Sequence, residues 1–264
     1  MHQDDILAPL EAIMREAGDI ARATVQGNFR RWTKGRDNSP VSDGDIAVNN
    51  FLRARLSTLT PDAGWLSEET EHDPSAAASE RCWIVDPIDG TRAYIAGRAD
   101  WTVAVALVEI GVPQVAAIFA PMTEEMFLAA RGRGATLNGS PILAKTGAGL
   151  TGAKLAGPKR YLDQLARLHP HIAAQPKVFS LALRLTRVAQ GELDAAFASA
   201  GSHDWDIAAA DLLVHEAGGV MTDFAGRGLV YNRPQPAHGP LVAAGHARHA
   251  ALLDLLRDRA AEFA

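Results

Sequence analysis

The sequence predicts a mixed α/β fold, built either as one large domain or as two packed halves that share a core. Three observations lead to this prediction. Apolar residues recur at helical spacing near the N-terminus, residues 101–130 form apolar runs separated by turn residues, and helical and strand patterns alternate over residues 181–263. With 264 residues, the chain is long enough to bury a sizeable core.

The composition excludes several other classes of protein. Apolar residues make up 47% and charged residues 22% of the chain, and the net charge of −5 offers no basic surface to a nucleic-acid polymer. The single cysteine, Cys82, excludes an internal disulfide framework and fits a reducing compartment. No apolar run approaches the roughly 20 residues that span a membrane, and the first residues lack a signal-peptide pattern. We therefore expect a cytoplasmic protein with no membrane partner.

Helical patterns dominate the first part of the chain. Apolar residues from Ile6 to Ile20 recur at helical spacing, and Gly27 marks the predicted end of that helix. A second helix is predicted from about Ser42 to Leu59. Trp65 and Leu66 indicate a short strand, and the polar, alanine-rich residues 71–80 predict a surface loop.

Asp45 has two interpretations at this stage. Ser42 and Asp45 match a capping-box pattern, which gives Asp45 a purely structural role. The run Asp43-Gly44-Asp45 also resembles the nucleophile loop of haloacid-dehalogenase-type phosphatases. That loop should follow a buried apolar strand, whereas Asn38-Ser39-Pro40 precedes it here, so the context argues against this alternative.

Glu68 and Glu69 follow the short strand directly. Adjacent side chains in an extended chain point to opposite faces, so one of the two glutamates is predicted to point inward. Taken alone, such a pair is more often part of a solvated turn.

Residues 83–91 carry the strongest chemical signal. Residues 83–85 read as the end of a buried strand, which delivers Asp86 and Asp89 to one point, with a rigid proline between them and the permissive Gly90 after them. Two carboxylates at such a point suit Mg²⁺ better than zinc. Thr91 adds a hydroxyl, and the amides around it would cradle an anion if a helix begins there. The alternative is an Asp-Pro turn followed by a capping aspartate.

An antiparallel meander is predicted next, from strands near residues 101–108, 115–119 and 126–130 and a turn at Asn138-Gly139. Residues 147–152 spell G-x-G-x-x-G, but a proline follows too soon for the helix that a dinucleotide site requires. We interpret this stretch as a loop between two halves.

The second half alternates helices and strands. Asp206 is placed at the start of a helix, where a plain N-cap is the commoner use of such an aspartate. His203 and His215 are interpreted as surface or packing residues. The predicted elements are a helix over 181–190, a strand over 193–198, a helix from Asp206 to Gly218-Gly219, strands over 220–223 and 241–244, and a closing helix over 247–263.

Five acidic residues thus stand at the ends of predicted elements, and their joint occurrence resembles the inositol monophosphatase superfamily of Mg²⁺-dependent, typically lithium-sensitive phosphomonoesterases. These residues are Asp45, Glu68, Asp86, Asp89 and Asp206. The matching motifs cover most of the chain: the pair Glu68-Glu69, the block from Asp86 to Thr91, and the block from Trp205 to Ala210 with Glu216-Ala217-Gly218-Gly219 behind it.

The resemblance implies a layered α-β-α-β-α sandwich of the inositol monophosphatase and fructose bisphosphatase type. An α+β half, residues 1–140, would carry most metal ligands. An α/β half, residues 141–264, would contribute Asp206 and substrate contacts. The family is often homodimeric, although no stretch of this sequence indicates an oligomeric state.

The resemblance also implies roles for individual residues. Hydrolysis of a small-molecule phosphate monoester would proceed by direct attack of metal-activated water, without a phosphoenzyme. Asp45 and Thr91 would orient this water, with Glu68 as a further catalytic residue, and Glu69 would support the ligands from behind. The amides of Gly90 and Thr91 would hold phosphate. Two or three Mg²⁺ ions would be bound by Glu68, Asp86, Asp89, Asp206 and the carbonyl of Ile88.

The substrate stays open between three candidates. An inositol-phosphate-like monoester comes first, although the family's usual inositol-binding glutamate is replaced here by Ala198 or Ser199. Arg184 lies near a lysine position of the 3'(2'),5'-bisphosphate nucleotidases, where it would hold a second phosphate or else be a solvated helix residue. Residues 86–97, with Arg92, are similar to bacterial histidinol-phosphate phosphatases.

A different class of function is a metal- and phosphate-binding regulatory protein without turnover. Asp45 and Thr91, the implied water-orienting pair, are both present. A protein that only binds has no need of them, so their presence favours the enzyme.

Overall fold

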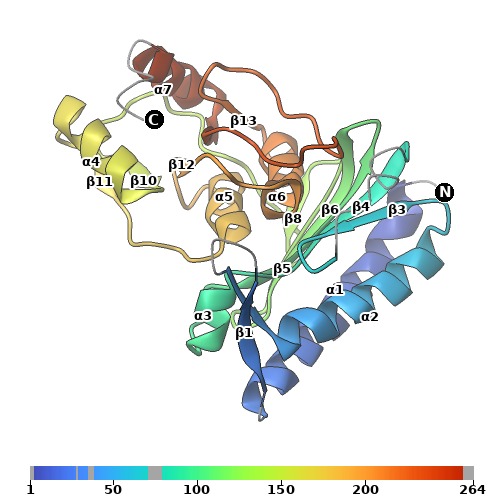
Figure 1. Ribbon diagram of the computed structural model, residues 1–264. Coiled ribbons are helices and arrows are strands. Elements are labelled where there is room, and N and C mark those ends of the chain that lie inside the picture. Colours follow the sequence, from blue (N-terminus) through green and yellow to red (C-terminus); the bar gives the residue numbers. More distant parts are fainter. Residues whose placement is uncertain (1–2, 28, 35–38, 71–78, 258–264) are drawn as a thin grey trace.

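The computed structural model describes residues 3–27, 29–34, 39–70 and 79–257. Within these residues, helices and sheets stack in the order α-β-α-β-α (Figure 1). This arrangement confirms the predicted layered α/β fold. No helix in the described ranges is both long and apolar enough to cross a membrane.

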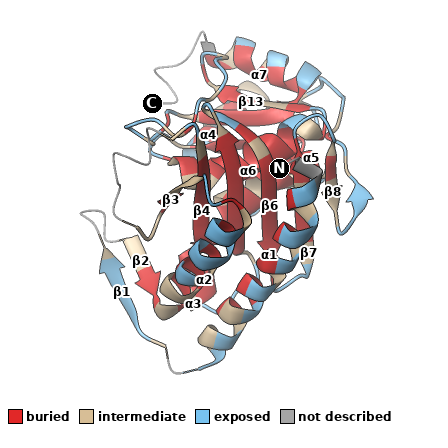
Figure 2. Ribbon diagram, turned by 90° about the vertical axis from the view of Figure 1, so that its right-hand side faces the viewer, coloured by how far each residue is buried: buried red, intermediate tan, exposed pale blue. Residues whose placement is uncertain are grey.

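The first layer consists of α1 (Gln3–Gln26) and α2 (Asp43–Leu59), which pack on each other and on one face of the larger sheet. Their inner sides are buried and their outer sides are exposed (Figure 2). Helix α2 begins at the N-cap Ser42, as predicted. Both helices therefore form because amphipathic segments cover a sheet face.

The larger sheet has the strand order β3-β4-β5-β6-β7-β8-β9 in the described part of the chain. Strand β3 is parallel to β4, and all other neighbours are antiparallel, which confirms the predicted meander. Asn138 and Gly139, with φ of 49° and 78°, form the predicted turn between β8 and β9. The strands are β3 (Gly64–Ser67), β4 (Arg81–Asp89), β5 (Thr102–Glu109), β6 (Val112–Ala120), β7 (Glu125–Ala130), β8 (Ala135–Leu137) and β9 (Ser140–Pro141).

The middle layer contains α5 (Leu181–Ala189) and α6 (Asp204–Glu216). Helix α6 contacts β4, β5 and β6 of the larger sheet and β13 of the smaller one. All of its residues from Ile207 to Val214 are buried. A helix that is buried on every side over this stretch fits a position between two sheets.

The smaller sheet has the order β11-β10-β12-β14-β13 and is covered on its outer side by α4 and α7 (Figure 1). Residues 258–263 of the predicted closing helix lie outside the described residues. The elements are β10 (Lys154–Ala156), α4 (Lys159–Leu168), β11 (Ala173–Ala174), β12 (Ala195–Ala198), β13 (Gly219–Asp223), β14 (Leu241–Gly245) and α7 (His246–Arg257).

Several features differ from the sequence prediction, including the unpredicted strands β10 and β11. A hairpin of β1 (Arg31–Lys34) and β2 (Ser39–Ser42) precedes α2, and α4 was not predicted. Strand β4 does not end at residue 85 but continues to Asp89, because the chain passes through a bulge and pairs again with β5.

Other predictions on this part of the chain are confirmed or stay open. The G-x-G-x-x-G stretch at 147–152 is a loop, as predicted. Within described residues 147–158 no helix begins, and the next helix, α4, begins at Lys159. Residues 71–78 of the predicted surface loop lie outside the described residues. The division at residue 140 stays a prediction, since β9 (Ser140–Pro141) spans it.

Candidate active site

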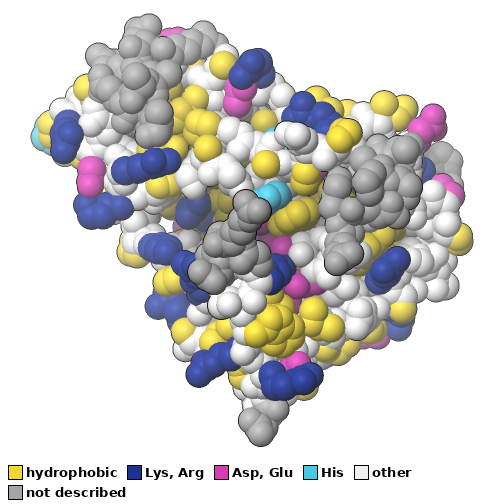
Figure 3. Space-filling model, in the orientation of Figure 1, with side chains coloured by type: hydrophobic (Ala, Val, Ile, Leu, Met, Phe, Trp, Pro, Cys, Tyr) yellow, Lys and Arg dark blue, Asp and Glu magenta, His cyan; other side chains and the backbone are white. Residues whose placement is uncertain are grey.

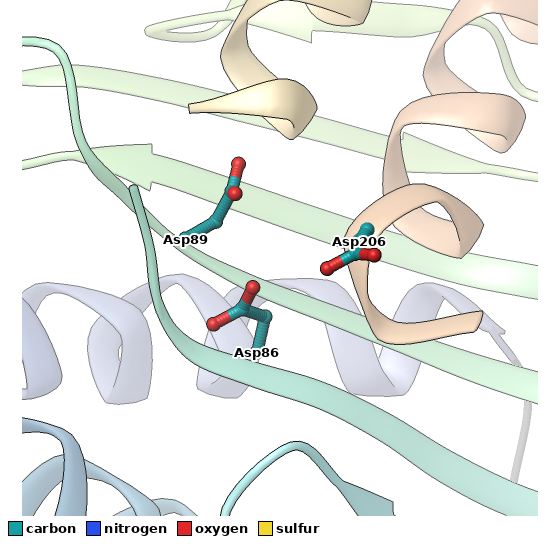
Figure 4. Close-up of side chains that lie close together, drawn as sticks. All are labelled: Asp86, Asp89 and Asp206. Atoms are coloured by element: carbon teal, nitrogen blue, oxygen red, sulfur yellow. The ribbon is translucent and has the colours of Figure 1, made fainter. Parts of the chain in front are cut away.

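The site begins at the C-terminal end of β4. Asp86 and Asp89 both pair with β5, and the register shifts between them. In a regular strand, side chains three positions apart point to opposite faces, so the bulge is what turns both carboxylates to one side. Figure 4 shows the two carboxylates directed into the same space.

Helix α6 brings Asp206 to the same space (Figure 4). Asp206 caps its own helix, because its Oδ2 accepts a hydrogen bond from the amide of the N-cap residue His203 at 2.6 Å. Asp206 is therefore not the predicted N-cap, which is His203, but the N3 residue of a capping box, and this role does not exclude a second one. One carboxylate oxygen from each of Asp86, Asp89 and Asp206 lies within 4.8 Å of the others. We call these three residues the acidic cluster.

Burial and mutual repulsion act together on the acidic cluster. Burial raises the pKa of Asp86 well above its usual value, and the charges of Glu68 and Asp89 raise it further. Burial also raises the pKa of Asp206 well above normal, and the charge of Asp89 adds to this. None of the three forms an ion pair with a lysine or arginine among the described residues. A cation from outside the chain would relieve this repulsion.

Asp89 is fixed by the start of α5. Its Oδ2 accepts hydrogen bonds from the Ser180 hydroxyl and from the Ala182 amide, the latter at 2.6 Å. Burial raises the pKa of Asp89, and the Ser180 hydrogen bond opposes that rise. One oxygen of Asp89 is thus held by the helix N-terminus, where a negative charge is favoured.

Asp45 and Thr91 lie beside the cluster. The Oδ2 of Asp45 accepts from the Ser42 amide at 2.7 Å and from the Ser42 hydroxyl at 2.6 Å, which confirms the capping box. Its Oδ1 lies 3.3 Å from the Thr91 hydroxyl, which is also 3.0 Å from the Ile88 carbonyl. Burial raises the pKa of Asp45 to about 6, against the opposing Ser42 hydrogen bonds.

Asp43 takes no part in this arrangement. Its Oδ2 accepts from the Arg30 amide at 2.8 Å near the surface. The two carboxylates of Asp43-Gly44-Asp45 therefore do not converge, which argues against the dehalogenase-type interpretation.

Glu68 and Glu69 share one cation. The Nζ of Lys34, on the β1–β2 hairpin, lies 3.2 Å from Glu68 Oε1 and also pairs with the carboxylate of Glu69. Only 18% of the Glu68 side chain and 4% of the Glu69 side chain are exposed. Burial raises the pKa of both glutamates, and Lys34 opposes the rise. Both side chains are thus largely buried, whereas the sequence predicted this for one.

The acidic cluster, Glu68 and Thr91 line a pocket of about 240 Å³. Acidic side chains lie near the middle of the face seen in Figure 3, and Lys and Arg side chains gather beside them, below α4. Gly90, with φ of 90°, begins α3 (Thr91–Ile95) at the pocket wall. The lining residues include the acidic cluster, Glu68, Ile88, Gly90, Thr91, Arg92 and Lys177.

A family model described as "Inositol monophosphatase family" matches residues 2–260. The chain belongs to this family. It is 33% identical over 238 residues to the histidinol-phosphatase of Mycobacterium tuberculosis, with 86% of this chain and 90% of that protein covered. It is 37% identical over 221 residues to the Nus factor SuhB of Salmonella typhimurium, with 80% and 78% covered.

Two further family members extend the comparison. The 3'(2'),5'-bisphosphate nucleotidase CysQ of Aggregatibacter actinomycetemcomitans is 29% identical over 249 residues, with 89% of this chain and 90% of that protein covered. A solved IMPase/NADP phosphatase, complexed with Mg²⁺ and phosphate, has a TM-score of 0.81 and 23% identity over 91% of this chain and 90% of that one. The last likeness shows that the fold is shared.

A second pocket, of about 660 Å³, adjoins the first, and Lys177 lines both. Arg184 lines the second pocket, and its Nε is buried without a hydrogen-bond partner in the described structure. Burial lowers the pKa of this guanidinium, and the charge of Asp89 opposes the fall. Arg184 is therefore half-buried at a pocket wall, and the interpretation as a solvated helix residue is wrong. Ser199 lines the same pocket.

The structure brings most of the predicted residues of this inositol monophosphatase family member together around one pocket, with Arg184 beside it. Asp45 and Glu69 do not line the pocket themselves, but Asp45 contacts Thr91, and Glu69 shares Lys34 with Glu68. Sequence reasoning missed Lys34, Lys177 and Ser180. Ser180 precedes a helical pattern and is the N-cap of α5, so a capping signal was available for it. Lys34 and Lys177 carry no local signal, because only the fold places Lys177 at the pocket and Lys34 beside Glu68 and Glu69.

Proposed function

We propose that this protein is a Mg²⁺-dependent phosphatase that hydrolyses a small-molecule phosphate monoester, with an inositol-phosphate-like compound as the first candidate. The observation that supports this most is the convergence of the acidic cluster and Thr91 at one pocket, with Asp45 in contact with the Thr91 hydroxyl. Oxygen ligands of this kind are those that Mg²⁺ prefers.

The donor set fits divalent cations. In the proposal, two or three Mg²⁺ ions are held by the acidic cluster, Glu68 and the Ile88 carbonyl. Bound Mg²⁺ would neutralise the phosphate charge, make a water more acidic and stabilise the leaving alkoxide. The family relative solved with Mg²⁺ and phosphate agrees with this assignment.

The residues of the chain have distinct proposed tasks. The carboxylate of Asp45, which faces the Thr91 hydroxyl, would accept a proton or hydrogen bond from the attacking water, with Glu68 assisting. The amides of Gly90 and Thr91 would hold the phosphate. Glu69, paired with Lys34, would keep Glu68 in place.

A second candidate substrate is a monoester whose leaving group carries another anion, such as a 3'(2'),5'-bisphosphate nucleotide. The buried, partnerless Nε of Arg184 favours it, because an anion in the second pocket would pair with this guanidinium. Lys159 and Lys177 line the same pocket, which disfavours the cationic histidinol phosphate there. The histidinol-phosphatase relative nevertheless keeps that compound in the comparison.

The test is phosphate release by the purified protein with inositol 1-phosphate, 3'-phosphoadenosine 5'-phosphate and histidinol phosphate, each with and without Mg²⁺. We expect Mg²⁺-dependent turnover of at least one compound. Arg184→Gln should raise KM about 10-fold for the bisphosphate, since one charge-assisted contact is lost, and leave KM for inositol 1-phosphate unchanged. Turnover that needs no metal would contradict the proposal.

The same assay separates the enzyme from a regulatory protein without turnover, an alternative prompted by the relative that is named a Nus factor. Phosphate binding without release of phosphate from any compound would favour the regulatory role. Inhibition by Li⁺, a homodimeric state and a cytoplasmic location belong to our proposal as properties that the family resemblance implies. Li⁺ added to the assay and light scattering of the purified protein check the first two.

A further inference from the structure

The segment from Tyr231 to His238 lies along the start of α6. The amide of Asp204 donates to the Pro236 carbonyl at 2.8 Å, and the amide of His238 donates to the Ser202 carbonyl at 2.7 Å. These two bonds lie on either side of His203, whose own amide donates to the Asp206 carboxylate. The segment therefore fixes the backbone from which Asp206 projects.

The Asp204 carboxylate makes this attachment specific. It is 1% exposed, its Oδ1 is hydrogen-bonded to His238 Nε2 at 2.6 Å, and its Oδ2 accepts from the Asn232 amide at 2.7 Å. Asp204 and Asp206 are two positions apart in a helix, about 200° around its axis, so they point to nearly opposite sides. One aspartate thus faces the acidic cluster while the other holds the helix to the segment.

The segment also reaches the larger sheet. The side-chain amide of Asn232 donates to the Ser79 carbonyl at 3.1 Å, just before β4, and the Tyr231 amide donates to the Gly111 carbonyl at 3.0 Å. Farther along α6, the Tyr231 hydroxyl donates to Asp211 at 2.8 Å. The start of α6 is therefore held relative to the sheet that carries Asp86 and Asp89.

We infer that Asp204 and His238 are positioning residues that set the distance from Asp206 to Asp86 and Asp89, and thereby the affinity of the metal that the acidic cluster binds. This inference rests on the proposed role of the acidic cluster as a metal site. Neither residue touches the metal or the substrate. Both act through the backbone of His203 and Asp204, on which the capping bond of Asp206 depends.

The experiment measures direct Mn²⁺ binding by electron paramagnetic resonance, which reports on the metal site without turnover. The variants are Asp204→Asn, His238→Ala and His238→Gln. Asp194→Asn is the matched control, because Asp194 is also a buried carboxylate that accepts from a backbone amide, Lys154 at 2.9 Å, but its partners Lys154, Lys145 and Arg248 all lie outside α6. Circular dichroism and thermal unfolding without metal show whether each variant is folded.

Asp204→Asn and His238→Ala are expected to weaken Mn²⁺ binding about 10-fold, as substitutions behind metal ligands commonly do. His238→Gln keeps an N–H donor and should recover most of the affinity. The double variant Asp204→Asn/His238→Ala should bind no more weakly than the weaker single variant, because the two residues act as one unit. Asp194→Asn should bind as the unsubstituted chain does.

Two results would overturn the inference, and they differ from a failure of the proposed function. In the first, Asp204→Asn and His238→Ala bind Mn²⁺ normally while Asp206→Asn does not. In the second, Asp194→Asn weakens binding as much as Asp204→Asn, so that the loss reflects stability alone. If the unsubstituted chain binds no Mn²⁺, the proposed metal site fails and the inference fails with it.

Discussion

Asp194 and the acidic cluster are both buried acidic groups, yet their surroundings differ. Asp194 is 7% exposed, and its oxygens lie 3.2 Å from Lys145 Nζ and 3.0 Å from Arg248 Nη1. The acidic cluster places three carboxylates together and has no ion pair with a lysine or arginine among the described residues. A buried charge is costly unless it is paired, so the comparison separates a structural carboxylate from carboxylates arranged for a cation that the chain does not supply.

The substitution Asp86→Asn should show the largest difference between the acidic cluster and the paired carboxylate of Asp194. We expect Mg²⁺-dependent phosphate release to fall about 1,000-fold, as when one preorganised electrostatic group is removed. In the absence of metal the variant should be at least as stable as the unsubstituted chain, because one of three repelling charges is gone. Phosphate release and urea unfolding without Mg²⁺ measure the two effects. If the variant were inactive because it is unfolded, Asp86 would be a structural carboxylate like Asp194, and the comparison would fail.

Asp194→Asn should behave in the opposite way. Arg248 is only 7% exposed, and it would lose the carboxylate that compensates its charge. The free energy of unfolding should drop by about 3 kcal/mol, as when one partner of a buried ion pair is lost. The Mg²⁺ concentration for half-maximal activity should not change. Urea unfolding and a Mg²⁺ titration of activity check this, and a shifted titration would show that the two regions are coupled.

The pH dependence of stability should also distinguish the acidic cluster. Its carboxylates have folded-state pKa values above the usual 3.8, so without metal the folded state binds more protons and loses stability as pH rises through that window. Bound Mg²⁺ keeps the carboxylates ionised, so the stabilisation by Mg²⁺ should grow as pH rises above 3.8 through the raised pKa values of Asp86 and Asp206.

The expected size of this gain is about 2.7 kcal/mol when Mg²⁺ is present at 100 times its Kd. Urea unfolding at several pH values, with and without Mg²⁺, measures it. The gain should be absent in Asp86→Asn. A stabilisation that is the same at every pH would mean that the bound ion does not compete with protons on these carboxylates.

Much of the site could be predicted because its signals are local. Residues 83–91 combine an apolar strand with proline and glycine, and Asp206 lies within two residues of the observed start of α6, although the sequence placed that start at Asp206 itself. Local signals also explain why Asp45 had two interpretations from the sequence. It is both a capping residue and a neighbour of Thr91, and only the second relation depends on the fold.

Other features could not be predicted because they depend on distant parts of the chain. The bulge in β4 appears only once β5 pairs on both sides of it. The contacts of Ser180 with Asp89 and of Lys34 with Glu69 join residues far apart in sequence. The β1–β2 hairpin has four residues in each strand, too few for a clear periodic pattern.

The position of α6 between the two sheets has a consequence for local unfolding of the protein. A divalent ion on the acidic cluster would join positions about 120 residues apart along the chain, which is a long loop for an unfolded polypeptide to close. Such an ion acts as a removable cross-link between β4 and α6. Neither element would then open without releasing it, so we expect their amide hydrogens to exchange with solvent as one cooperative unit.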